Sequence, residues 1–168
     1  MNSIVSLSPA GERRARASRG IMVGVRACLL WLTLAGCVAP PAPSLEDAKY
    51  AAALGVDISA STKVSSMYIR DLTVGTGDAA MSGQLVTMRY TGWLIDGTQF
   101  DSNQAAGFQF RIGAGRVIQG WDLGVRGMQL GGERQLIIPP ELGYGEDGTQ
   151  GIPGNAILVF KVMMLSTP

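Results

Sequence analysis

The chain has 168 residues, of which 46% are hydrophobic and 23 are glycine. This length suits one modest domain with an appendage, and the glycine content favours a turn-rich β or α+β domain over a helical bundle. The absence of histidine excludes histidine-dependent catalytic triads and the common zinc sites that use histidine. Both cysteines, Cys28 and Cys37, lie near the N-terminus. We therefore expect no disulfide or thiol chemistry in the folded domain.

The charge is unevenly distributed along the chain. Five of the 14 basic residues are arginines that precede Cys37, whereas only one of the 13 acidic residues lies there. The remainder carries nine basic and twelve acidic residues, a net charge of −3, without a basic stripe. We therefore expect no nucleic-acid partner for the mature chain.

An apolar run, ACLLWLTLAG at 27–36, follows Arg26. It is too short to span a bilayer and is typical of the hydrophobic region of a signal peptide. The run leads into Leu34-Ala35-Gly36-Cys37, which resembles the cleavage box of bacterial lipoproteins, where the cysteine becomes the acylated N-terminus. An ordinary signal peptide and a short buried helix are the alternatives. The resemblance implies a lipid-anchored protein of the cell envelope that faces the periplasm, and Val38 after the cysteine favours the outer membrane.

Two kinds of sequence separate the cysteine from the domain. VAPPAPS at 38–44 is a proline and alanine tether, expected to be extended and solvated. SLEDAKYAAALG at 44–55 predicts a short helix, since Ser44 suits an N-cap and Gly55 suits a helix end. We expect a signal peptide at 1–36, a lipidated cysteine, tether and short helix at 37–61, and the folded domain at 62–168.

Short strands follow from residue 62 onward. Residues 86–90 (VTMRY) alternate between apolar and polar side chains, which predicts a half-buried strand. Asp96-Gly97 lies between two such runs and predicts a hairpin. Further strands are expected around Phe108 and Phe110, at 134–138 and in the last segment, where Leu158, Phe160, Val162 and Met164 share one face.

One short helix is predicted at 117–126, where apolar residues recur at Ile118, Trp121 and Val125. Gly120 and Gly124 interrupt this pattern, although glycine is a poor residue in a helix interior. A helix buried under a wrapped sheet would explain them, because glycine lets strands approach closely. The sequence therefore predicts an α+β fold, with an antiparallel sheet wrapped around one short α-helix and preceded by the signal peptide, the tether and the first short helix.

Four motifs follow one another in order: YTGWLIDGTQFDS at 90–102, FQFRIGAGRVIQGWDLGVRGM at 108–128, ELGYG at 141–145 and GIPGNAILVFKVMML at 151–165. Together they resemble an FK506-binding-protein (FKBP) domain, which is a peptidyl-prolyl cis-trans isomerase. The resemblance covers most of residues 64–166. It implies an antiparallel sheet around a short helix, with a pocket that holds a proline ring among aromatic walls.

The resemblance also implies the residues of the site. Trp121 would form the floor of the pocket, with one ring face open to a cavity. The Ile118 backbone N–H and the Tyr144 hydroxyl would hold substrate carbonyls, while Asp101, held by the Tyr90 hydroxyl, would face the rotating carbonyl. The catalytic positions are then Tyr90, Asp101 and Tyr144, and the substrate-binding positions are Phe100, Phe108, Phe110, Val117, Ile118, Trp121, Ile152 and Phe160.

These polar positions have simpler alternatives. Tyr90 and Tyr144 could be partly buried residues whose hydroxyls only satisfy the hydrogen bonding of a loop. Asp101 could cap the turn after Phe100, and Trp121 could be an ordinary core residue. The chain also departs from the family after FDS, where the NQAAG loop at 103–107 is short and lacks the arginine that often braces the Asp–Tyr pair. Asn103 or Gln104 could replace that arginine by hydrogen bonding.

The function implied by the resemblance is isomerisation of Xaa-Pro peptide bonds, assisting the folding of exported proteins without a cofactor or metal. The implied partners are proline-containing unfolded or exported polypeptides, macrolide inhibitors of the FK506 type, and a membrane contacted through the lipid anchor. The alternatives are a proline-peptide-binding or chaperone module with little catalysis, and an adhesion protein that contacts host proteins. Family domains that lose catalysis often lose the pocket Trp, Asp or Tyr, whereas this chain keeps Trp121, Asp101 and Tyr144.

Overall fold

The computed structural model describes residues 43–166, so the predicted signal peptide, Cys37 and most of the tether lie outside the described residues. Within this range, six strands form one antiparallel sheet with the order β1-β2-β5-β6-β3-β4. Across the described range, no helix combines the length and the apolar character needed to cross a membrane. The strands are β1 (Thr62–Val64), β2 (Met67–Thr73), β3 (Leu85–Leu94), β4 (Gln99–Arg111), β5 (Glu133–Ile138) and β6 (Leu158–Ser166).

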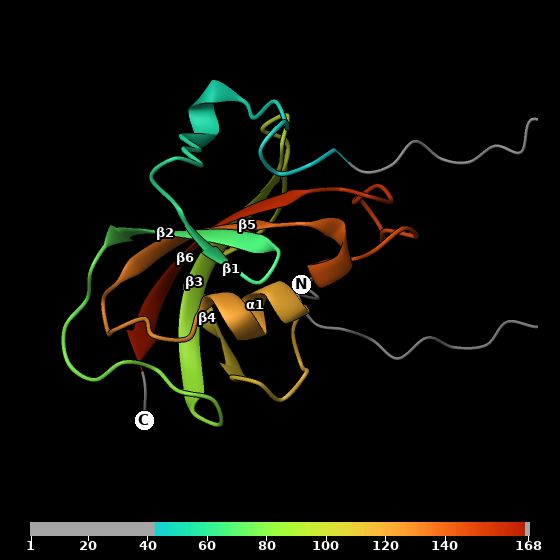
Figure 1. Cartoon of the computed structure of the whole chain (residues 1–168). Helices are drawn as coiled ribbons and strands as arrows, with labels where there is room; N and C mark the ends of the chain where they lie inside the picture. The colour runs from blue at the N-terminus through green and yellow to red at the C-terminus, as the bar shows by residue number, and fades with distance from the viewer. Residues whose placement is uncertain (1–42, 167–168) are drawn as a thin grey trace, which may run out of the picture. The chain divides into compact units, whose positions relative to one another are not determined.

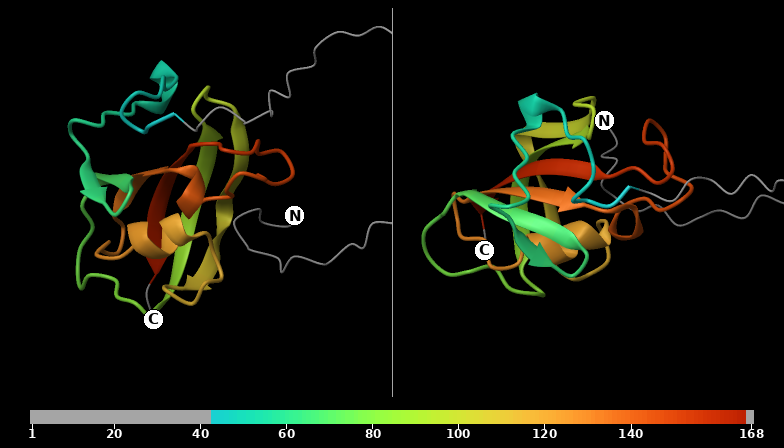
Figure 2. Two further views of the ribbon diagram at one scale, coloured as in Figure 1. Left: turned by 45° about the vertical axis from the view of Figure 1, so that its right-hand side comes forward. Right: turned by 45° about the horizontal axis from the view of Figure 1, so that its top comes forward.

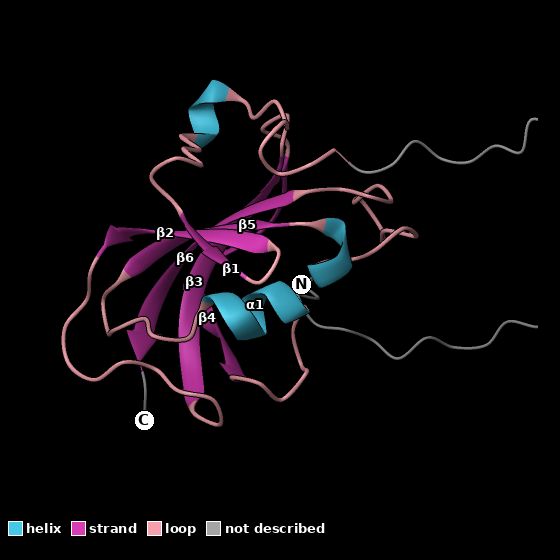
Figure 3. Ribbon diagram, viewed as in Figure 1, coloured by secondary structure: helices cyan, strands magenta, loops and turns pink. Residues whose placement is uncertain are grey.

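One short α-helix, α1 (Gln119–Gly124), lies against the sheet (Figures 1 and 3). Two 3-10 turns, η1 (Ala52–Leu54) and η2 (Pro140–Leu142), complete the described elements. This arrangement confirms the predicted α+β class with an antiparallel sheet around a short helix. The helix is shorter than the predicted 117–126, because Ile118 is extended, with φ −57° and ψ 148°, and acts as its N-cap.

Close contact between α1 and β5 explains the two glycines of the helix. A Cβ atom on Gly120 would lie 2.5 Å from Ile138 Cγ2, and one on Gly124 would lie 2.8 Å from Leu136 Cδ2. Both distances are too short for a side chain, so only glycine permits this separation of helix and strand. The interpretation of the glycines as close-packing residues is confirmed.

The alternation predicted for the strands is also confirmed. Val86, Met88 and Tyr90 on β3 are at most 1% exposed and face the core that contains α1. The hairpin between β3 and β4 turns at Asp96-Gly97, where the Leu94 N–H donates to the Thr98 carbonyl over 2.9 Å. On β6, all four residues predicted to share a face are buried in the same core: Leu158, Phe160, Val162 and Met164.

The opposite face of the sheet is covered by the segment that precedes β1. Leu45 is buried there against Ile137 and Ile157, so β5 contributes Ile137 to this cluster and its neighbours Leu136 and Ile138 to the core around α1. Figures 1 and 2 show this segment and α1 on opposite sides of the sheet.

The helix predicted at 44–55 is not formed as such. Ser44 does cap one turn, since its Oγ accepts the Asp47 N–H over 3.1 Å, but the chain then runs on to the short η1. The Tyr50 hydroxyl donates to the Leu45 carbonyl over 2.8 Å, and the Ala51 N–H donates to the Ile95 carbonyl over 2.7 Å. Packing and hydrogen bonding to the sheet therefore replace the local bonds of a helix, which tertiary contacts readily do for a short segment.

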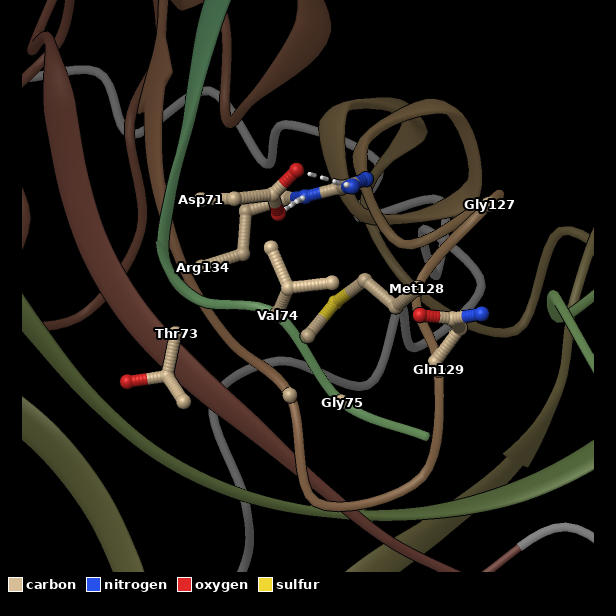
Figure 4. Close-up of a pocket in the computed structure, with 9 residues that line it drawn as sticks. Asp71, Thr73, Val74, Gly75, Gly127, Met128, Gln129 and Arg134 are labelled. Carbon is tan, nitrogen blue, oxygen red and sulfur yellow. Dashed lines mark hydrogen bonds and ion pairs between the residues drawn. The ribbon is translucent and has the colours of Figure 1, made fainter. Parts of the chain in front are cut away.

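Arg134 of β5 connects its own strand to β2 and to the C-terminal end of α1. Its guanidinium forms a bidentate pair with Asp71 on β2, with N–O distances of 2.6 and 3.0 Å. Its Nη1 donates to the carbonyls of Gly124 and Arg126 over 2.8 Å each, which places a cation at the C-terminal end of α1, where the helix dipole favours it. Figure 4 shows the pair beside a cavity of about 20 Å³, large enough for a single water molecule.

Replacing Arg134 with methionine should therefore destabilise the fold. The substitution removes four hydrogen bonds from a side chain that is 6% exposed and leaves the carbonyls at the end of α1 without this donor. We expect a loss of about 2–4 kcal/mol in the free energy of unfolding, measured by denaturant titration.

The control is Lys161→Met, which breaks the exposed pair with Glu133 at 3.8 Å. An exposed pair of this kind contributes less than about 1 kcal/mol. Equal losses for the two variants would contradict the role given to Arg134.

Candidate active site

Trp121 on α1 is surrounded by four aromatic rings. Tyr90, Phe108 and Phe160 meet it edge to face, with centroid distances of 5.0, 6.2 and 5.4 Å, and Phe110 is tilted at 5.6 Å. The rings come from α1, β3, β4 and β6, so the sheet wraps them around the helix. Edge-to-face pairs contribute about 0.5–1.5 kcal/mol each beyond their buried area.

The indole of Trp121 is completely enclosed. Its exposed fraction is 0%, and its Nε1–H makes no hydrogen bond within the described residues. The expectation of an open ring face is therefore not met, because the four neighbouring rings close over the indole. A buried donor without an acceptor costs about 1–3 kcal/mol.

A hydrogen-bonded pair lies at the edge of this cluster. The Tyr90 hydroxyl donates to Asp101 Oδ2 over 2.6 Å. Asp101 is a strand residue of β4 that faces Gly92 in the register with β3, so it does not cap a turn, and that alternative is wrong. Because Tyr90 is 1% exposed and Asp101 is half-buried, the phenol fixes the carboxylate where apolar and solvated surfaces meet.

Tyr144 reaches the cluster from the loop that follows η2. The N–H groups of Gly143 and Gly145 both donate to the Pro140 carbonyl over 2.9 Å, which fixes the chain on either side of the tyrosine. Burial of the hydroxyl, and secondarily the charge of Asp101, raise the pKa of Tyr144 above the usual 10. The phenol therefore stays protonated and able to donate a hydrogen bond throughout the neutral range.

The structure brings all the predicted aromatic and aliphatic positions together. Phe100, Phe108 and Tyr144 are half-buried and pack against one buried core, to which the others belong. Those buried positions are Tyr90, Phe110, Val117, Ile118, Trp121, Ile152 and Phe160. The surface offered to a ligand is therefore made by the half-buried rings and Asp101, supported from beneath by the enclosed rings.

Gly92 is a site residue that the sequence analysis missed. A Cβ atom at this position would lie 2.6 Å from Phe160 Cε1 and 2.7 Å from Phe100 Cζ. Those two rings meet edge to face with centroids 5.4 Å apart, so the space above Gly92 is filled by aromatic carbon. The signal was present as the glycine of YTGWL, two residues after the strand predicted at 86–90, since glycine in or near a strand often marks close approach of another group.

Asp122 was also missed. Its carboxylate accepts the N–H groups of Gly113 and Gly115, over 2.7 and 3.1 Å, and is 8% exposed. It thereby anchors the loop that leads into Ile118 to the helix that carries Trp121. The available signal was a single carboxylate inside an otherwise apolar helix.

The expected replacement for a bracing arginine takes another form. The Asn103 side chain bonds both the N–H and the carbonyl of Gly107, and the Gln104 amide donates to the Tyr90 carbonyl and to Thr91 Oγ1. These bonds go to backbone and to a neighbouring hydroxyl, so neither side chain takes the place of that arginine on the carboxylate of Asp101.

A sheet around a short helix that carries an aromatic cluster, with a Tyr–Asp pair at its edge, defines the class of protein. The model of the FKBP-type peptidyl-prolyl cis-trans isomerase family matches residues 77–165, more than half of the chain. The chain belongs to this family.

The curated relatives include fungal proteins named FK506-binding protein 4. The one from Aspergillus oryzae is 46% identical over 130 residues, which are 74% of this chain and 27% of the relative. The one from Neurospora crassa is 52% identical over 103 residues, 61% of this chain and 22% of the relative. The chain thus spans about a quarter of the length of the curated relatives it matches.

Two bacterial crystal structures share the fold. FkpA from Escherichia coli is 36% identical with a TM-score of 0.59, covering 64% of this chain and 51% of FkpA. A peptidyl-prolyl cis-trans isomerase from Pseudomonas syringae is 28% identical with a TM-score of 0.60, covering 69% of this chain and 86% of that one.

Gly92→Ala should disturb the site more than the fold. The added methyl group displaces the rings of Phe100 and Phe160, and such overpacking costs about 1–3 kcal/mol. We expect weaker binding of proline peptides, measured by titration calorimetry, with a cooperative unfolding transition retained. Gly131→Ala provides a control that strains the backbone, because φ is 78° there, but displaces no side chain, because a Cβ atom meets no neighbour. Gly92 itself has no positive φ, so only the displaced rings should affect peptide binding in Gly92→Ala. Unchanged peptide binding in Gly92→Ala would contradict the assignment.

The raised pKa of Tyr144 predicts an alkaline titration. Because the pKa in the folded state is above that in the unfolded state, the contribution of Tyr144 to stability is complete below pH 10 and is lost as the pH rises through the folded-state pKa. Tyrosinate absorbance should show that Tyr144→Phe removes a phase that titrates well above the ordinary value. As a comparison, Tyr50→Phe should remove a phase near the pKa of about 12 to which burial raises Tyr50. If the phase lost from Tyr144→Phe lies at the ordinary value, the buried position of the hydroxyl is wrong.

Proposed function

We propose that the chain catalyses cis-trans isomerisation of Xaa-Pro peptide bonds. The observation that supports this most directly is the Tyr90–Asp101 hydrogen bond of 2.6 Å at the edge of an aromatic cluster centred on Trp121. The family match supports it as well, since residues 77–165 contain every residue of this arrangement.

The chemistry demanded by this reaction is modest. Rotation about a peptide bond has a barrier of roughly 18–20 kcal/mol, because rotation breaks the amide resonance. An Xaa-Pro bond isomerises in tens to hundreds of seconds without a catalyst. Reaching milliseconds needs a rate enhancement of about five decades, or on the order of 7 kcal/mol. No covalent bond is formed or broken, so neither a nucleophile nor a proton transfer is required.

An apolar surface favours the transition state of this rotation. The twisted amide has lost resonance, so its carbonyl is less polar than that of the planar amide and loses less on leaving water. The half-buried rings of Phe100, Phe108 and Tyr144 would bind the proline and exclude water from the rotating bond. Binding energy realised in the twisted state lowers the barrier.

The polar groups would fix the substrate on either side of the proline. In this proposal the Tyr144 hydroxyl and the Ile118 N–H donate to substrate carbonyls, and Asp101, oriented by Tyr90, faces the rotating carbonyl carbon. The raised pKa of Tyr144 supports its role as a donor, because the phenol remains protonated.

The test is the cis-to-trans rate of an apolar-Xaa-Pro peptide with the purified full chain. Asp101→Val should lower kcat/KM at least about tenfold, since the carboxylate acts on the twisted state. Asp78→Val, which replaces an exposed aspartate outside the aromatic cluster, should leave the rate unchanged. Both variants are checked for cooperative unfolding.

The outcomes separate catalysis from binding alone. A folded parent that binds the peptide without accelerating isomerisation would be a proline-peptide-binding or chaperone module. Equal rates for the parent and a folded Asp101→Val variant would remove Asp101 from the mechanism. Competition by FK506, proposed here as a ligand because relatives are named for binding it, reports on the same surface.

We further propose that the full chain is a lipid-anchored protein of the cell envelope. It would face the periplasm from the outer membrane and assist the folding of exported polypeptides there. The support is in the sequence: arginines, the apolar run at 27–36 and Leu34-Ala35-Gly36-Cys37. An anchor beside the place where exported chains fold would raise the local concentration of the domain.

Fatty-acid labelling tests the anchor. The full chain is produced in a bacterial host supplied with a radioactive fatty acid, and Cys37→Ala should abolish labelling while the matched variant Cys28→Ala retains it. Labelling that survives in Cys37→Ala, or is absent from the parent, would contradict the lipoprotein proposal without affecting the assignment of the domain.

A further inference from the structure

The strand β4 carries a bulge directly beside the candidate site. Phe108 pairs with Met88 of β3, and Asn103 pairs with Tyr90, so residues 104–107 all lie opposite Arg89 alone. Asp101 lies three residues before this bulge and Phe108 immediately after it. Any movement of the bulge therefore shifts a polar group and an aromatic wall of the site together.

The side chain of Asn103 links the two ends of the bulge by hydrogen bonds to Gly107. Its Nδ2 donates to the Gly107 carbonyl and its Oδ1 accepts the Gly107 N–H, each over 3.2 Å. The side-chain amide thus makes the two bonds that a paired strand residue would make. Gly107 has a φ of +76°, and a Cβ atom there would lie 2.7 Å from Thr87 Cγ2, so the returning chain passes close to β3.

Gln104 ties the bulge to the strand that carries Tyr90. Its Nε2 donates to the Tyr90 carbonyl over 2.8 Å and to Thr91 Oγ1 over 2.9 Å, which uses both of its N–H bonds. Gln104 is exposed and lines a surface groove with Arg89, Glu133 and Lys161, so its side chain can be changed without repacking the core.

We propose that Asn103 and Gln104 are positioning residues, which hold the bulge in one conformation and through it fix the Tyr90–Asp101 pair and the ring of Phe108. They act on the site through the backbone of Tyr90 and through the bulge at 104–107, rather than by contact with the carboxylate. The inference rests on the proposed isomerase function. It states that the side-chain amides of Asn103 and Gln104 orient the catalytic groups of that site.

The first variants separate this role from a general effect on the strand. Gln104→Met keeps the length of the side chain and removes both donated bonds. We expect kcat to fall about tenfold and KM to stay within about twofold, because the displaced pair acts on the twisted state. Gln109→Met, a substitution of an exposed glutamine on the same strand, should leave kcat and KM unchanged.

Gln104→Glu supplies a signature that a loss of packing cannot produce. An ionised carboxylate cannot donate to the Tyr90 carbonyl, whereas a protonated carboxyl group can. The ratio of variant to parent kcat should therefore rise as the pH falls through the titration of the introduced carboxyl group. Measuring the parent at each pH corrects for Asp101 and for Glu133, Arg89 and Lys161, which line the groove beside position 104.

A second measurement is independent of activity. Backbone amide relaxation dispersion should be flat at Asp101, Gly107 and Phe108 in the parent and should show exchange in Gln104→Met and in Asn103→Ala. Unchanged kcat in Gln104→Met, or equal losses in Gln109→Met, would overturn the proposal. If the parent itself lacks isomerase activity, the proposed function fails, and flat dispersion in both amide variants would then overturn the positioning role separately.

Discussion

Burial of Trp121 between the helix and the wrapped sheet is the constraint on which the rest of the structure depends. Four aromatic rings from three strands enclose the indole, and this is possible only because α1 lies almost in contact with β5. Gly120 and Gly124 permit that approach, and Arg134 on the same strand, β5, donates hydrogen bonds to the carbonyls at the end of the helix. The close approach of α1 to the sheet, the curvature of the sheet and the packing of the aromatic cluster therefore depend on one another.

The chemistry of the candidate site follows from where this apolar cluster ends. A carboxylate placed inside the cluster would be costly to desolvate, and one placed far outside would act through water. Asp101 lies at the boundary because the buried Tyr90 phenol holds it there. The same boundary position keeps the Tyr144 hydroxyl protonated and leaves Phe100 and Phe108 half-buried, so rings, donor and carboxylate all lie at the edge of one cluster.

The parts of this protein that could be predicted are those set by local pattern or by family motifs. Alternation predicted the strand that carries Tyr90, and the apolar spacing with its two glycines predicted a buried helix around Trp121. The helix at 44–55 was predicted wrongly because its cap and propensity signals were real, but burial of Leu45 against Ile137 and Ile157 outweighs a few helical bonds. The open ring face of Trp121 was predicted wrongly because no local signal reports how far neighbouring rings close over an indole.

The sequence by itself determined the fold class and the order of the strands along the chain, and it predicted most of the candidate site residues, since periodicity, turns and family motifs are all local in the chain. Only the tertiary structure decided which groups meet. Gly92 lies under two rings, Asp122 binds a loop that precedes its own helix, and Gln104 bonds the carbonyl of Tyr90 across a bulge. Each of these contacts depends on strand register or on the closure of the sheet, which bring together residues that no sequence pattern relates.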